Sequence, residues 1–66
     1  MTISDLYYLC GNMNELTTFT IHPYKNGDFD PKCLFTGSWI KMPDNFRNAT
    51  VQYFEQNGKT VFVEIS

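Results

Sequence analysis

Residues 49–66, ATVQYFEQNGKTVFVEIS, are the stretch of this 66-residue chain that decides its fold. Asn57 and Gly58 stand between two runs that are rich in β-branched and aromatic residues, and both residue types tolerate the positive φ of a tight turn. We therefore expect the C-terminal segment to form a β-hairpin, and the rest of the chain to pack onto it.

Two strand registers are open for this hairpin. A two-residue turn would pair Phe54 with Val61 and leave apolar side chains on both faces. A three-residue loop, with Gly58 as a bulge, would pair Tyr53 with Val61 instead. The bulged register is favoured because it separates apolar from polar side chains, and a slip of one residue would undo that separation. Its apolar face would consist of Val51, Tyr53, Val61, Val63 and Ile65.

In the bulged register, Phe54 and Phe62 share the other, mostly polar face and lie diagonally close to each other. If the two rings are uncovered, an aromatic pair with a polar rim is a candidate interaction surface. The alternative is that another part of this small chain covers both rings.

Upstream of the hairpin, the sequence predicts one helix and two strands. Thr2 is a capping residue, and apolar side chains then recur at helical spacing up to Met13. Residues 16–23 and 33–42 are typical of strands, with Phe19 and Ile21 on one face of the first. The fold class is therefore α+β: one short N-terminal helix packed on an antiparallel sheet of about four strands, in meander order, that ends in the bulged Asn-Gly hairpin.

Length and charge bound the possible functions. The 66 residues form a single domain, 1–66, and a domain of this size often needs support from a disulfide, a metal or a partner chain. Five Lys and Arg against seven Asp and Glu give a net charge of −2, and the cations are scattered, which argues against direct nucleic-acid binding. The N-terminus lacks a secretory leader and no membrane span is visible, so we expect a cytoplasmic protein with reduced cysteines.

Three side chains are candidate metal ligands. Cys10, His22 and Cys33 are the soft ligands of the chain, and Asp30 is a possible fourth, oxygen ligand. Zinc takes tetrahedral sets of this composition, and a structural zinc would stabilise a small fold. The spacing matches no zinc signature, however. The alternative is a strand register that pairs Ile21 with Cys33, which leaves His22 outside and the cysteines as ordinary apolar residues.

No motif for catalysis is present. A Cys and His pair can act as nucleophile and base, but a chain of this length has little material for a cleft around them. Glycine-rich phosphate motifs are absent as well. We therefore expect a protein that is not an enzyme.

Aromatic residues are the unusual feature of the composition. Six Phe, four Tyr and one Trp exceed what so small a core can hide. Aromatic side chains concentrate at protein interfaces, and acidic neighbours suit a basic protein partner. The predicted partner-binding residues are Phe54, Phe62, Glu64, Tyr24, Phe29, Asp28 and Asp30.

In size and layout, the segments MTISDLYYLC, LTTFTIH and TVQYFEQNGKTVFVEIS together resemble the very small proteins encoded by phages and prophages of Gram-positive bacteria. The resemblance spans most of the chain and includes no diagnostic motif. Many such proteins inhibit host defences, among them anti-CRISPR proteins that block type II effector nucleases, and at least one of that class contains zinc. The resemblance implies an inhibitor that binds a Cas9-type effector and stops it from loading DNA.

Two other functions stay open. Exposed aromatic rings can stack on bases, so an oligomer of this chain could sequester a nucleotide signal. A structural or accessory phage protein without inhibitory activity is the other alternative.

Overall fold

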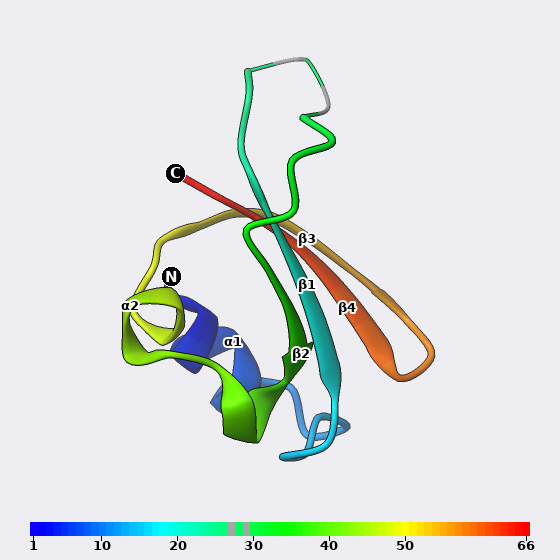
Figure 1. The fold of residues 1–66 in the computed structure, drawn as a ribbon. Coiled ribbons are helices and arrows are strands. Elements are labelled where there is room, and N and C mark those ends of the chain that lie inside the picture. The colour runs from blue at the N-terminus through cyan, green and yellow to red at the C-terminus, as the bar shows by residue number, and fades with distance from the viewer. Residues whose placement is uncertain (27, 29) are drawn as a thin grey trace.

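The computed structural model describes residues 1–26, 28 and 30–66, and it confirms the α+β class (Figure 1). One short N-terminal helix packs with two further helical turns on a four-stranded sheet. None of the helices among the described residues is long and apolar enough to cross a membrane. The elements are α1 (Ile3–Leu9), β1 (Thr18–Pro23), β2 (Phe35–Ser38), η1 (Trp39–Lys41), α2 (Asp44–Arg47), β3 (Val51–Asn57) and β4 (Thr60–Ile65).

The sheet is mixed, with strand order β2-β1-β4-β3. The hairpins β1–β2 and β3–β4 are antiparallel, but the central strands β1 and β4 run parallel. The expected meander and wholly antiparallel sheet are therefore wrong. After β2, the chain crosses the helical side of the sheet through η1 and α2 and enters β3 at the far edge. A crossover of this kind is what allows two strands to pair in parallel.

The C-terminal hairpin turns one residue later than expected, at Gly58-Lys59, and pairs Asn57 with Thr60. Neither register considered from the sequence is correct, and the bulge lies at Gln52, between its paired neighbours in β3. Gly58 has φ of +63°, whereas no described residue other than glycine has a positive φ. A two-residue turn with glycine first needs positive φ at one position only, so Asn57 does not have to adopt a positive φ.

The core lies between the sheet and the helices. α1 begins with a capping box, in which Thr2 and Asp5 each bond the other's backbone N–H through their side chains (3.1 and 2.9 Å). Ile3 and Leu6 then point into the core. In β1, Phe19 and Ile21 are fully buried, as their spacing predicts. The other buried apolar residues are Met13, Trp39, Met42, Val61, Val63 and Ile65.

The expected strand over residues 33–42 is interrupted. β2 ends at Ser38, and the chain continues as the 3₁₀ turn η1. Gly37 lies opposite Phe19, and a Cβ at this position would be only 3.1 Å from Cζ of Phe35. Gly37 therefore lies where a side chain approaches the strand backbone closely.

Candidate interaction surface

One face of the sheet is left uncovered by the helices, which all lie on the opposite side (Figure 1). We call this uncovered side the open face. Its members follow from the strand registers and from the alternation of side chains along each strand. They are Thr18, Thr20 and His22 of β1, Thr36 and Ser38 of β2, Tyr53, Glu55 and Asn57 of β3, and Thr60, Phe62 and Glu64 of β4.

Three rings lie in a row across the open face. The rings of His22 and Phe62 are 5.0 Å apart, and those of Phe62 and Tyr53 are 6.4 Å apart in an edge-to-face arrangement. Tyr53 is 47% exposed, Phe62 is half-buried and His22 is buried. The Tyr53 hydroxyl donates a hydrogen bond to Oε2 of Glu55, 3.4 Å away. Tyr53 therefore combines exposed aromatic area with a contact that orients a carboxylate.

The open face is acidic. All its strand residues are described, and the charged ones are Glu55 and Glu64, without any Lys or Arg. Glu64 pairs with His22 in the neighbouring strand and with Tyr53 on its other side. A surface of this charge attracts a basic partner and repels nucleic acid.

A hollow lies at the hairpin end of the open face. It has a volume of about 490 Å³, opens to solvent and is lined by Glu55, Asn57, Thr60 and Phe62. We call it the hairpin hollow. Except for Phe62, these residues were not predicted to bind a partner. A turn at Gly58-Lys59 is the sequence signal that would have found them, because it places these alternate positions of β3 and β4 on one face.

Phe54 is placed differently from the expectation. It pairs with the buried Val63, so it lies on the helical side of the sheet, whereas Phe62 pairs with Glu55 on the open face. The predicted Phe54 and Phe62 pair on one face is therefore wrong. Phe54 is nevertheless 41% exposed, because edge strand β3 extends beyond the helices. The error follows from the register, which differs from the bulged one by an odd number of residues.

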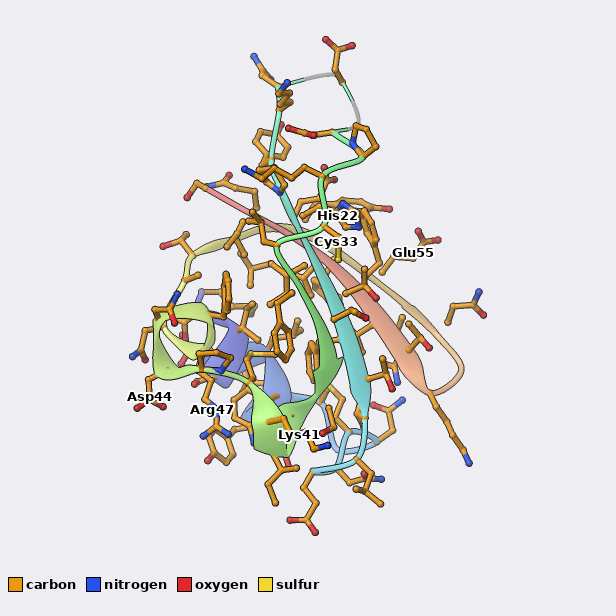
Figure 2. The ribbon with its side chains drawn as sticks, viewed as in Figure 1. His22, Cys33, Lys41, Asp44, Arg47 and Glu55 are labelled. Atoms are coloured by element: carbon orange, nitrogen blue, oxygen red, sulfur yellow. The ribbon has the colours of Figure 1, made fainter. Side chains whose placement is uncertain are left out.

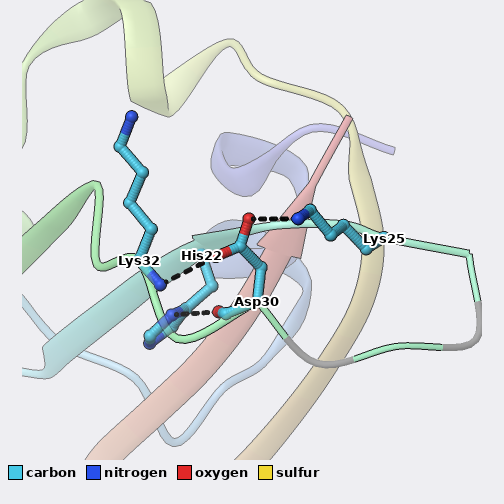
Figure 3. A network of polar contacts seen from close by, with 4 residues as sticks. All are labelled: His22, Lys25, Asp30 and Lys32. Atoms are coloured by element: carbon cyan, nitrogen blue, oxygen red, sulfur yellow. Dashed lines mark hydrogen bonds and ion pairs between the residues drawn. The ribbon is translucent and has the colours of Figure 1, made fainter.

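The loop between β1 and β2 is held by Asp30 (Figure 3). The Asp30 carbonyl lies 3.1 Å from Nδ1 of His22, and its carboxylate accepts the backbone N–H of Lys32 at 2.9 Å. Nζ of Lys25 completes an ion pair at 3.5 Å. The N–H of Lys32 lowers the pKa of Asp30, burial opposes part of this effect, and the charge of Lys25 adds a smaller lowering. Asp30 therefore acts within the loop rather than as a free surface charge.

Tyr24 and Asp28, two further predicted partner-binding residues, lie near this loop. Tyr24 is 40% exposed, and its backbone N–H donates to the carbonyl of Ile65 at 2.7 Å. Asp28 is exposed. Phe29 lies outside the described residues. Tyr24 and Asp28 thus extend the accessible surface beyond the end of β1.

The predicted zinc ligands are distributed over both sides of the sheet. Cys10 caps the C-terminal end of α1 and packs against the core, whereas His22 belongs to the open face. Cys33 is exposed at the start of the chain leading into β2, and its Sγ donates to the carbonyl of Phe35 (Figure 2). Among residues 1–26, 28 and 30–66, no three His, Cys, Asp or Glu side chains form a group that could hold a metal. Zinc binding stays a prediction, which elemental analysis would test.

Comparisons of the chain with models of protein families, with curated proteins and with solved structures find no match. The open face, with its rings and carboxylates, is therefore the ground for a functional proposal.

Proposed function

We propose that this chain is a non-catalytic inhibitor, which binds a basic host-defence effector and blocks its loading of nucleic acid. The best-fitting effector class is the Cas9-type nuclease. The observation that carries the proposal is the open face, where exposed Tyr53 and half-buried Phe62 lie among the carboxylates of Glu55 and Glu64. The inhibitor would act in the cytoplasm of the infected bacterial cell.

Charge supports this choice of partner. Effectors of this class hold nucleic acid in channels lined by Lys and Arg. An acidic face competes for the same cations, and long-range attraction accelerates association with them. Aromatic side chains supply the buried area that makes such a contact specific. The resemblance in size and layout to phage-encoded inhibitors favours the same partner class.

The dimensions of the chain also support binding through one face. The molecule measures 29 × 22 × 19 Å and has a surface of 4218 Å². A stable protein interface covers about 800 Å² of each partner, roughly a fifth of this surface. The broadest side of the molecule, 29 × 22 Å, can supply most of that area. The open face can therefore form the main part of such an interface.

The test is a binding and cleavage experiment with a panel of purified Cas9-type nucleases. We expect the chain to form a one-to-one complex with a susceptible nuclease, and to inhibit DNA cleavage when added before the DNA. Inhibition should weaken when the DNA is added first, because the cations are then occupied. Absence of binding and uninhibited cleavage across the panel would contradict the proposal. Native mass spectrometry of the same sample would reveal the oligomer that nucleotide sequestration requires.

A further inference from the structure

The hairpin hollow is built from two adjacent rungs of the β3–β4 ladder. Glu55 pairs directly with Phe62, and Asn57 pairs directly with Thr60. All four side chains therefore project from the same side of the hairpin. Figure 2 shows Glu55 pointing away from the helical side of the sheet. Backbone pairing thus fixes the relative positions of one carboxylate, one amide, one hydroxyl and one aromatic ring.

The carboxylate of Glu55 has no cationic partner within the described chain. Among the described residues, the ion pair within 4.0 Å is the one between Lys25 and Asp30. Both of these residues are distant from the hairpin in the sequence. The Glu55 side chain accepts a 3.4 Å hydrogen bond from the Tyr53 hydroxyl, which leaves further lone pairs of the carboxylate available. Glu55, Asn57 and Thr60 are all exposed. The negative charge is therefore accessible to a ligand.

We infer that the hairpin hollow binds an arginine side chain presented by a protein partner. A guanidinium has five N–H donors in one plane, and it matches the oxygen acceptors of Glu55, Asn57 and Thr60. It also packs favourably against an aromatic ring such as Phe62. Lysine has a compact, strongly hydrated ammonium that suits this mixed set less well. Phosphates and carboxylates are repelled by Glu55.

This inference rests on the proposed function for the nature of the partner, which presents arginines because it handles nucleic acid. The recognition chemistry itself belongs to the isolated chain and can be measured without the partner. A shallow, open hollow holds one side chain weakly, so the arginine must be positioned by the surrounding interface. The hollow would thus set which part of a basic partner docks on the open face.

The experiment is an amide NMR titration of the full chain with N-acetylarginine amide, with the lysine and citrulline amides as matched probes. We expect saturable shifts at Glu55, Asn57, Thr60 and Phe62. The arginine probe should bind most tightly, the lysine probe less tightly and the citrulline probe least. Glu55→Gln should weaken arginine binding about fivefold or more, because both the charge and its hydrogen bonds to the guanidinium are lost. Glu64→Gln removes the same charge from the same face but outside the hollow. This variant should leave arginine binding almost unchanged.

Several results would overturn the inference. These are equal shifts with arginine and lysine, equal losses for Glu55→Gln and Glu64→Gln, shifts centred elsewhere, or no saturable shift. Amide dispersion reports whether each variant folds. Thr60→Val is a second variant at an exposed position, and it should also weaken arginine binding because it removes the hydroxyl of the hollow. If the arginine probe binds in the hollow but no nuclease binds the chain, arginine binding by the hollow is supported and the proposed function is contradicted. If a nuclease binds and Glu55→Gln leaves its affinity unchanged, the hollow is not where its arginine docks.

Discussion

Phe54 and Phe62 lie on opposite sides of the sheet, because Phe54 pairs with buried Val63 whereas Phe62 pairs with Glu55. The aromatic neighbour of Phe62 on the open face is Tyr53, whose ring centroid is 6.4 Å away. Two consecutive residues of β3, both substantially exposed, therefore present aromatic rings to different sides of the molecule. Substitutions of Tyr53 and Phe54 therefore form a matched pair that can show which side of the sheet binds a partner.

Tyr53→Ala should weaken binding to the effector, whereas Phe54→Ala should not. A tyrosine within a contact typically contributes tenfold or more to affinity, and we expect a loss of about that size for Tyr53→Ala. The two variants remove rings of similar exposure, 47% and 41%, from adjacent positions of one edge strand. Calorimetric titration with a susceptible nuclease measures both. A larger loss for Phe54→Ala would place the interface on the helical side and remove the open face as the binding surface.

Gly58→Ala should destabilise the fold by about 1–2 kcal/mol, because alanine is strained at the φ of +63° that the turn requires. Gly11→Ala is the control. A Cβ at Gly11 meets nothing within 4 Å and the residue has no positive φ, so this change should be neutral or stabilising by up to about 1 kcal/mol. Urea denaturation measures both differences. Equal stability of the two variants would contradict the glycine-first turn.

Side-chain alternation and helical spacing were sufficient to predict the general fold from the sequence. Phe19 and Ile21 are buried in β1 while Thr18 and Thr20 face outward, because an extended strand alternates sides whatever it pairs with. The order of the strands has no comparable local signal. β4 runs parallel to β1 only because the segment from Trp39 onward crosses the helical side of the sheet, and that path depends on packing of the whole chain.

The candidate site was harder to predict, because it depends on one residue of the turn. Asn57-Gly58 and Gly58-Lys59 are both plausible two-residue turns, and only the second is present. Relative to the bulged register, the observed pairing transfers Tyr53 from the core side to the open face. The aromatic composition therefore predicted that some aromatic side chains are exposed, but it did not predict that Tyr53 is one of them.

Leu6→Ala should destabilise the chain by about 2–5 kcal/mol, because Leu6 is almost fully buried and its removal leaves a cavity between α1 and the sheet. A small domain has a total stability of about 3–5 kcal/mol, so this variant should be largely unfolded at room temperature. Leu9→Ala in the same helix removes a side chain that is 73% exposed and should change little. Circular dichroism melts distinguish them. A Leu6→Ala variant that melts at the same temperature as Leu9→Ala would contradict the docking of α1 on the sheet.

Acid should weaken the fold through Asp5 and Asp30. Hydrogen bonds from the backbone N–H groups of Thr2 and Lys32, respectively, lower the pKa of these carboxyls below the ordinary value of 3.8. A lowered pKa in the folded state means that the ionised form stabilises the fold above pH 3.8, and that this contribution is lost as the pH falls through the folded pKa. Asp5→Asn and Asp30→Asn should each flatten the dependence of melting temperature on acid pH. Asp28→Asn is an exposed control in the same loop as Asp30. Its melting temperature should depend on acid pH more steeply than that of Asp5→Asn or Asp30→Asn.

Arg47→Lys should cost about 1 kcal/mol of stability and loosen the packing around Trp39. The Arg47 guanidinium lies 4.5 Å from the centre of the Trp39 ring, and Nη2 donates to the carbonyls of Trp39 and Ile40 at 2.8 and 3.3 Å. Lysine retains the charge but cannot reproduce the planar contact and both hydrogen bonds. It also removes the buried Nε–H, which has no hydrogen-bond partner among the described residues, and this offsets part of the loss.

Fluorescence of Trp39, the single tryptophan, reports this change directly. We expect a red-shifted emission and an earlier urea midpoint for Arg47→Lys, because the indole is 6% exposed in the native fold and gains access to water as its cover loosens. Lys41→Ala, in the neighbouring exposed position of η1, should leave both measurements unchanged. Unchanged emission and midpoint in Arg47→Lys would mean that the stacking of Tyr7 on Trp39, with ring centroids 4.0 Å apart, is enough to hold η1 against the core.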